Sequence, residues 1–434
     1  MKRLLIVIIA LLVAIPLTIG VMAGVAYYTT DESSVPAPKL LVMGQEVAPA
    51  GYDWHEPVFG GVIYRDFSYP PIEGPNVASL SVPNLTVEAP AGYEVNARLL
   101  LNNEEVWSGD GPGLAAYQFI NNGRYKLELA CERSQEGKRG WGAIHYLCSF
   151  TVAVEPRLEV SDEWVQQGDL MALRVYNLPT GMVPKAETGL GEVCFMQTGN
   201  GIMTAYVPIG HAREPALYSL VVTAGQYEWE ATVRVIETSF PVESLVVQVE
   251  EDPAIPEEER QPVRLSDVAS ASPADYREYS EKIVPLFETW EENKLWSGLF
   301  SMPVKANVTV PYGQTTYASS VSGSLRQSGL GIAAEAGAPV VAPNGGKVIF
   351  AEDTDNMGTV VVIEHGGGLK SLFFFVTDLE VEVGDTVTKD QKIAAAPAKG
   401  WSSKASVYYE ARLGYETLDP TSLYGGNSSL YYFS

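Results

Sequence analysis

An uncharged, mostly apolar stretch at residues 4–30 constrains this chain more than any other feature. As a helix it is long enough to cross a hydrocarbon core of about 30 Å, whereas a secretory signal has an apolar region of only about 7–15 residues. Lys2 and Arg3 precede the stretch, and Asp31 and Glu32 follow it. This charge distribution predicts a single-pass anchor at residues 1–30, with the N-terminus inside and the bulk of the chain extracytoplasmic.

Cleavage of the apolar stretch remains an alternative, because Ala23 and Gly24 are small enough to serve a signal peptidase. The length of the stretch favours the uncleaved anchor, and both alternatives predict export. The residues that follow, 31–44, are polar and Pro-rich, and we expect them to form a tether that leaves the membrane.

Short segments that alternate apolar and polar residues dominate the next two hundred positions. Period-2 alternation between Gly, Asn and Pro turns is typical of half-buried strands in β-sandwiches. We therefore predict a mainly β chain with two sandwiches, at 45–156 and 157–238, which resemble immunoglobulin-like modules. The expected strands include residues 97–101, 125–129, 149–154, 158–160, 173–176, 205–208, 218–222 and 231–235.

Two cysteines flank a turn-rich segment in the first predicted sandwich. A hairpin centred between Lys138 and Gly140 would place Cys131 opposite Cys148. Cysteines on facing strands can bond in an oxidising compartment, so the pattern allows a disulfide; two buried thiols are equally compatible with it. The third cysteine, Cys194, is expected to be a small core residue.

The charge and histidine content exclude some functions. Acidic residues outnumber basic ones 53 to 29, for a formal net charge of −24, which opposes binding to the phosphate backbone of nucleic acids. The chain has only four histidines, His55, His145, His211 and His365, and no two of them have the spacing of metal ligands. We expect them to be core or surface residues.

A linker and a helical connector are predicted at residues 239–299. Residues 250–261 are acidic and contain two prolines, as in a solvated linker. Ser272 and Pro273 have the pattern of an N-cap and first helical residue, and Pro285 should interrupt the helix that follows.

From Phe300 onward the pattern is again β and resembles a known family. Four segments carry the likeness: Pro311-Tyr-Gly, Gly329-Leu-Gly-Ile-Ala, Gly337-Ala-Pro-Val-Val-Ala-Pro and Val381-Glu-Val-Gly-Asp-Thr-Val. In this order and spacing they resemble the M23 (LytM-like) zinc peptidases, which cut peptidoglycan. The resemblance covers about residues 300–424. It implies a β domain of the duplicated-hybrid-motif type at 300–426, followed by a tail at 427–434.

The resemblance implies a zinc site, but the residues do not support one. The family holds its metal with an H-x-G-x-D element and the second histidine of an H-x-H strand, leaving a fourth position for a water whose pKa the metal lowers. Two further histidines of the family handle protons. Aligned on the motif glycine and on the strand after H-x-H, the metal positions hold Gln327, Gly331 and Tyr408, and the other catalytic positions hold Ser406 and Phe375.

None of these five residues can replace its counterpart. Gly331 has no side chain and Phe375 has no lone pair, while Tyr408 would have to lose a proton that it holds up to a pKa near 10. His365 matches a structural position of the family. Residues 353–356 cluster two aspartates and an asparagine, which suits a solvated hairpin tip better than a metal site. We therefore expect no catalytic residue, no metal and no cofactor.

The replacements convert a polar cleft into an aromatic one. Phe375 and Tyr408, with Gln327 beside them, would form a groove that binds sugar rings or a peptide, or they would collapse into core. We predict a non-cleaving envelope protein that binds peptidoglycan or a partner protein. The alternatives are an active zinc endopeptidase with a rearranged site and a purely structural surface protein.

Overall fold

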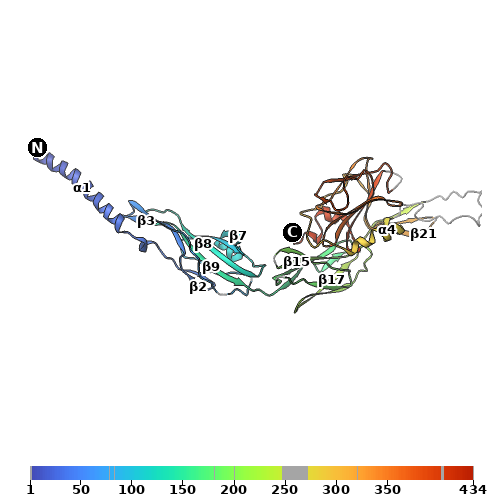
Figure 1. Cartoon of the computed structure of the whole chain (residues 1–434), viewed down its shortest axis with the longest axis horizontal. Helices are drawn as coiled ribbons and strands as arrows, with labels where there is room; N and C mark the ends of the chain where they lie inside the picture. The colour runs from blue at the N-terminus through green and yellow to red at the C-terminus, as the bar shows by residue number, and fades with distance from the viewer. Residues whose placement is uncertain are drawn as a thin grey trace, which may run out of the picture. The chain divides into compact units, whose positions relative to one another are not determined.

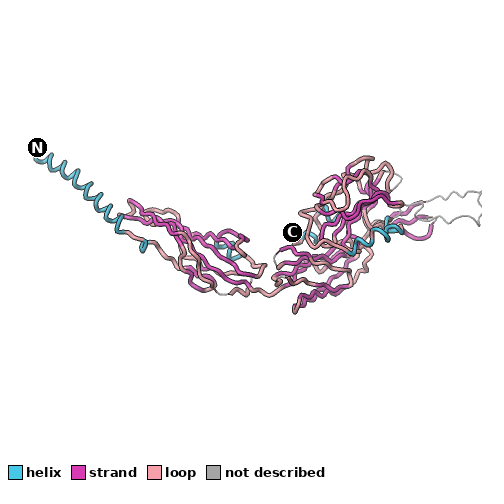
Figure 2. The backbone as a smooth tube through the Cα atoms, viewed as in Figure 1, coloured by secondary structure: helices cyan, strands magenta, loops and turns pink. Residues whose placement is uncertain are grey.

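The computed structural model describes residues 2–77, 79–82, 84–179, 181–199, 201–246, 272–319, 321–401 and 405–433. The chain forms two compact units, residues 1–155 and 156–434. Strands are the predominant secondary structure of both units (Figure 2), so the prediction of a mainly β chain is confirmed. The expected acidic linker at 250–261 lies outside the described residues.

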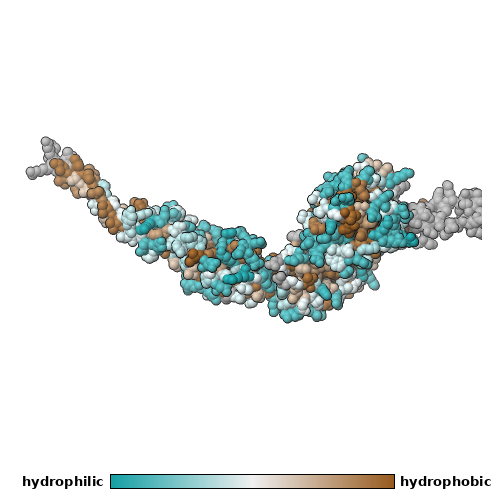
Figure 3. All heavy atoms as spheres, in the orientation of Figure 1, coloured by the Kyte–Doolittle hydropathy of each residue, from teal (hydrophilic) through white to brown (hydrophobic). Residues whose placement is uncertain are grey.

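The chain begins with an exposed apolar helix, α1 (Lys2–Thr29) (Figure 1). Its segment Ile6–Thr29 is long and apolar enough to cross a membrane, as in a membrane anchor or a signal sequence, and forms the brown rod in Figure 3. Arg65 caps the helix end: its guanidinium donates to the carbonyl oxygens of Tyr27, at 2.7 Å, and Thr30. These carbonyls lack partners within the helix, so Arg65 ties α1 to the first sheet.

The first unit contains two sheets around one core. The larger sheet has the order β4-β3-β9-β8-β6-β7, and the smaller one β2-β1-β5. Buried side chains from both sheets, such as Leu40, Leu99 and Leu127, form one cluster. The strands are β1 (Leu40–Val42), β2 (Gln45–Val47), β3 (Gly51–Val58), β4 (Ile63–Tyr69), β5 (Val87–Glu88), β6 (Glu94–Leu101), β7 (Glu104–Asp110), β8 (Gly123–Arg133) and β9 (Trp141–Val152), with a short helix α2 (Gly111–Ala116).

The prediction of a free tether at residues 31–44 is wrong. Asp31 caps a short 3-10 helix, η1 (Glu32–Ser34), and β1 begins at Leu40. The side chains of Leu40 and Val42 are fully buried, and the Tyr146 hydroxyl donates to the carbonyl of Pro38 at 2.5 Å. The sequence did not reveal this strand, because β1 is only three residues long. An alternation that short cannot be recognised among prolines.

Of the two alternatives for Cys131 and Cys148, the structure has the two buried thiols and not the disulfide. Strands β8 and β9 form the expected hairpin, but Cys131 lies opposite Ile144, and Cys148 lies opposite Leu127. The two cysteines are therefore four positions out of register, too far apart to bond. All three cysteines are free. The actual turn is centred about two residues before the position we expected.

The second unit begins with a sandwich of two four-stranded sheets, β10-β12-β15-β14 and β11-β17-β16-β13. Its core includes Leu173, Val207 and Val222. A likeness to immunoglobulin modules stays a prediction. The strands are β10 (Arg157–Val160), β11 (Trp164–Gln166), β12 (Leu170–Tyr176), β13 (Lys185–Thr188), β14 (Met196–Gly199), β15 (Ile202–Pro208), β16 (Leu217–Ala224) and β17 (Tyr227–Ile236).

The C-terminal domain is built on an eight-stranded sheet with the order β19-β22-β29-β26-β25-β24-β27, in which β30 also pairs with β29. Two small sheets, β23-β28 and β18-β20-β21, complete it. The strands are β18 (Val242–Leu245), β19 (Val308–Val310), β20 (Thr315–Ala318), β21 (Val321–Arg326), β22 (Leu330–Ala333), β23 (Pro339–Val341), β24 (Gly346–Thr354), β25 (Gly358–Gly366), β26 (Leu369–Val376), β27 (Thr386–Val387), β28 (Lys392–Ala395), β29 (Ser406–Leu413) and β30 (Glu416–Leu418).

The second sandwich and the C-terminal domain share a hydrophobic core. Leu170 and Tyr206 of the sandwich pack in one cluster with Leu369 and Leu413 of the large sheet. The chain end joins this cluster: after α5 (Pro420–Gly425), the 3-10 helix η5 (Ser429–Tyr431) buries Leu430. The tail predicted at 427–434 is thus packed against this cluster over its described residues, through Leu430, Tyr431 and Phe433.

A helical connector precedes the C-terminal domain, as expected. It consists of η3 (Pro273–Asp275), α4 (Arg277–Lys282) and η4 (Val284–Glu288). The Asp275 carboxylate accepts from the backbone N–H of Ser272 at 2.9 Å, which fixes the N-terminal end. Pro285 lies in η4, where the α-helix has already ended.

The hairpin register predicts the chemistry of the thiols. Burial raises the pKa of Cys131 to about 11 and that of Cys148 to about 12, so neither is a thiolate at neutral pH. In the absence of reductant, the cysteines of the folded chain should react slowly with a thiol reagent. After unfolding in guanidinium, all three thiols of the chain should react at once. A single equivalent after unfolding would contradict the register.

Candidate functional site

The pairing of three strands brings the expected metal positions together. Strand β29 lies between β22 and β26, and in this arrangement Gly331 and Phe374 are the two cross-strand neighbours of Tyr408. Gln327 lies just before β22, and the backbone N–H of the next residue, Ser328, donates to the Tyr408 hydroxyl at 3.0 Å. The structure therefore places Gln327, Gly331 and Tyr408 in one small region of the sheet.

The other two predicted positions lie at the edge of this region. Ser406 is buried two residues before Tyr408 and pairs with Ala333. Phe375 is half-buried and lies within a bulge of β26, where its φ of 57° is in the left-handed region. Because of this bulge, the ring that faces Tyr408 directly is that of Phe374, with 6.1 Å between centroids.

The indole of Trp401 fills the space beside Gly331. A Cβ added at Gly331 would lie 2.3 Å from the Trp401 ring and 3.1 Å from the Cβ of Val310. The same indole packs against Tyr408, with 5.0 Å between ring centroids. Any side chain at position 331 would have to displace this ring, so glycine here is a requirement of the packing.

Zinc does not fit these residues. Position 331 offers no ligand atom, and its space is taken by Trp401. Burial and the neighbouring Glu410 carboxylate raise the pKa of Tyr408 well above its usual range, so its hydroxyl keeps its proton. Within the described residues, no three His, Cys, Asp or Glu side chains are close enough to share a metal ion.

The helical connector covers this face of the sheet. Three connector residues are buried in one cluster with Phe374 and Tyr408: Tyr279 of α4, Ile283 between α4 and η4, and Phe287 of η4. The Tyr279 ring stacks on that of Phe374 at a centroid distance of 5.9 Å. Farther along, the Glu278 carboxylate accepts from the backbone N–H of Asn356 at 3.2 Å, so α4 also holds the 353–356 turn.

A buried polar group joins α4 to β29. The Glu410 carboxylate oxygen Oε2 accepts from the Tyr279 hydroxyl at 3.1 Å and from Arg412 Nε at 2.8 Å. The guanidinium of Arg412 also lies over the ring of Phe287, 4.8 Å from its centroid. Burial and the charge of Glu410 raise the pKa of Tyr279 well above its usual range, so its hydroxyl remains a donor.

His365 lies in the core, away from these positions. Its ring nitrogens contact the Gly345 carbonyl oxygen at 2.7 Å and the Ser371 hydroxyl at 2.9 Å. Burial lowers its pKa to about 4. A neutral ring with both nitrogens occupied fits the structural role that the sequence predicted.

An open groove at Phe375, Tyr408 and Gln327 is not present. Tyr408 and Gln327 are only 0 % and 2 % exposed, and Trp401 and the connector pack in one cluster with Tyr408. The aromatic residues have collapsed into core, the second of the two outcomes expected. The sequence analysis missed Trp401 and Tyr279; a Ser-Pro capped helix carrying aromatic residues was the available signal for Tyr279.

Comparisons with known proteins agree with this fold. Residues 326–420 match the family model of Peptidase family M23. The murein hydrolase activator EnvC of Escherichia coli (strain K12) is 36 % identical over 104 residues, which are 24 % of this chain and 25 % of EnvC. An uncharacterized protein of Haemophilus influenzae is 32 % identical over 110 residues, 25 % of this chain and 26 % of that protein. The chain thus spans about a quarter of the length of these curated relatives.

A solved structure gives a more extended match. The crystal structure of a putative peptidase M23 from Pseudomonas aeruginosa covers 60 % of this chain and 94 % of its own, at 20 % identity and a TM-score of 0.42. The C-terminal domain of this chain is a Peptidase family M23 domain, as its sequence motifs predicted.

The polar contact between α4 and β29 predicts the effect of one hydroxyl. In Tyr279→Phe, the buried Glu410 carboxylate loses a donor, and we expect unfolding to cost about 1–3 kcal/mol less. Tyr276→Phe is the matched control, because the Tyr276 hydroxyl makes no hydrogen bond within the described part of the chain. Urea denaturation of the full chain in detergent measures both. Equal stabilities of the two variants would contradict the contact.

Proposed function

We propose that this chain is a membrane-anchored protein of the cell envelope whose M23 domain binds without cutting. It acts as a scaffold or regulator of wall remodelling, and its ligand is peptidoglycan or an envelope partner protein. The observation that carries the proposal is the side-chain packing at Gly331, where the Trp401 ring takes the space of a metal ligand. Without a metal to activate water and polarise the scissile carbonyl, the family's chemistry has no source.

The relatives support the envelope role. EnvC is named as an activator of murein hydrolases, and we infer a comparable role in wall remodelling for this chain. The helix α1 has the length of a membrane span, and the Lys2 and Arg3 charges before it favour an extracytoplasmic location for the two compact units. We therefore place the M23 domain on the outer face of the membrane.

The fold affects how the proposal must be tested. A fragment containing only the M23 domain would expose Leu369, Leu413 and Leu418, which pack against the second sandwich. Exposed apolar patches of this kind promote nonspecific binding. The full chain in detergent micelles is therefore the appropriate material.

Incubation of the full chain with purified sacculi separates binding from cleavage. We expect that chromatography detects no soluble muropeptides, with or without added zinc. We also expect the chain either to sediment with sacculi or to be retained by a protein from an envelope extract. Muropeptide release that a chelator abolishes would contradict the proposal and support the alternative, an active zinc endopeptidase with a rearranged site. Retention by neither sacculi nor an envelope protein would favour a purely structural role.

A further inference from the structure

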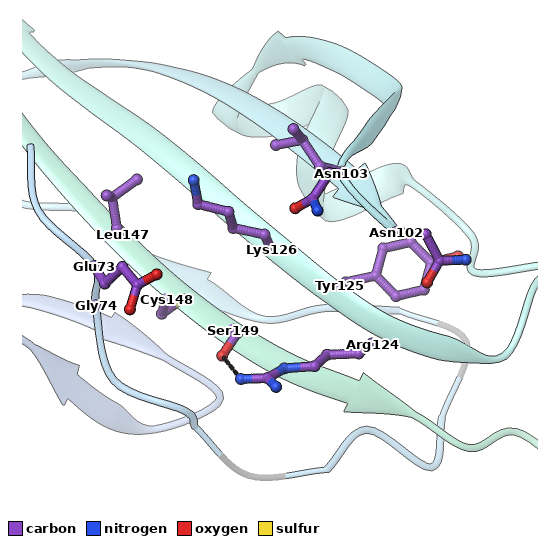
Figure 4. Close-up of a pocket in the computed structure, with 11 residues that line it drawn as sticks. Glu73, Gly74, Asn102, Asn103, Arg124, Tyr125, Lys126, Leu147, Cys148 and Ser149 are labelled. Carbon is purple, nitrogen blue, oxygen red and sulfur yellow. Dashed lines mark hydrogen bonds between the residues drawn. The ribbon is translucent and has the colours of Figure 1, made fainter.

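A polar trough of about 360 Å³ lies on the outer face of the large sheet in the first unit (Figure 4). Its floor is formed by Arg124 and Lys126 of β8 and by Leu147 and Ser149 of β9. Arg124 and Lys126 are two residues apart on one strand, so both side chains leave the same face of the sheet. The volume suits a ligand of the size of a sugar or a short peptide.

The two walls of the trough are fixed by the backbone. On one side, the segment that carries Glu73 runs along β9, and the Ser149 N–H donates to the Pro75 carbonyl at 3.0 Å. Gly74 permits this approach, because a Cβ there would lie only 1.6 Å from the Leu147 carbonyl oxygen.

On the other side is the turn between β6 and β7. Its residues Asn102 and Asn103 have φ values of 54° and 69°, a conformation that asparagine tolerates better than most residues. Both walls are therefore in place without a ligand.

The guanidinium of Arg124 is available for binding. It donates one hydrogen bond, to the Ser149 hydroxyl at 3.3 Å, and within the described residues it makes no ion pair. Lys126 lies beside it and pairs with Glu128 at 2.9 Å, but that carboxylate is also shared with Arg98 at 3.1 Å.

We propose that this trough binds a carboxylate-bearing fragment of the wall polymer. Arg124 takes the carboxylate, Lys126 adds a second positive charge, and the amides of Asn102 and Asn103 bond to the ligand's amide or hydroxyl groups. The choice of the wall polymer rests on the proposed function; the preference for a carboxylate rests on Arg124 alone. The carboxylate comes either from a stem peptide or from muramic acid, which the test distinguishes.

Calorimetric titration of the full chain in detergent tests the trough with three probes: the peptide L-Ala-γ-D-Glu-L-Lys, N-acetylmuramic acid and the neutral N-acetylglucosamine disaccharide. We expect one or both acidic probes to bind and the neutral probe to bind at least tenfold more weakly. Arg124→Gln should weaken the acidic probe about tenfold, as for loss of a charge-assisted hydrogen bond. The matched control is Arg139→Gln, which removes an exposed cation outside the trough. This variant should bind the probes as the wild type does.

Three results would overturn the proposal: no binding of either acidic probe up to about 10 mM, equal binding of the neutral probe, or unchanged affinity in Arg124→Gln. An unchanged melting temperature shows that the variant is folded, which is expected because Arg124 is exposed. These failures leave the proposed function intact, since that function depends on the M23 domain, which contains none of the trough residues. Retention of the Arg124→Gln chain on sacculi tests that function without the contribution of the trough.

Discussion

Aromatic packing holds the M23 domain closed at the place where its family binds zinc. Trp401 lies over Gly331 and against Tyr408, and the helical connector covers the same face with Tyr279 and Ile283. Each contact depends on the others, because a side chain at position 331 would displace the indole, and a loss of Tyr408 would leave both the indole and Phe374 without a partner ring. The free energy that a metal site would draw from coordination comes here from burial of apolar surface.

The closed face also explains why charges are buried beside it. Glu410 and Arg412 follow Tyr408 on the same side of β29, and both are shielded from water by the connector. Burying a carboxylate is costly unless it is paired and hydrogen-bonded, and the Tyr279 hydroxyl and the Arg412 guanidinium supply these partners. The hydrogen bond between Glu410 and the Tyr279 hydroxyl thus fixes where α4 lies on the sheet. The aromatic residues supply most of the buried apolar surface.

The sequence predicted some of these features and not others, for physical reasons. Period-2 alternation predicted the strands, and the order of the glycine motifs predicted the M23 fold, because both depend on local backbone geometry. The loss of the metal and catalytic positions was also predictable, since Gly331 has no side chain and Phe375 has no lone pair. The register that separates Cys131 from Cys148 could not be predicted, because several turns fit the segment between them. The packing of Trp401 onto Gly331 joins residues seventy positions apart, and no local pattern records it.

The most direct test of the account is the zinc affinity of the full chain. Equilibrium dialysis against micromolar zinc, followed by elemental analysis, measures it without reference to activity. The packing at Gly331 predicts zinc far below one ion per chain and no change in melting temperature on adding zinc. Stoichiometric zinc that Tyr408→Phe or Gln327→Ala removes would contradict the account, because it would show that the closed face opens to form a metal site.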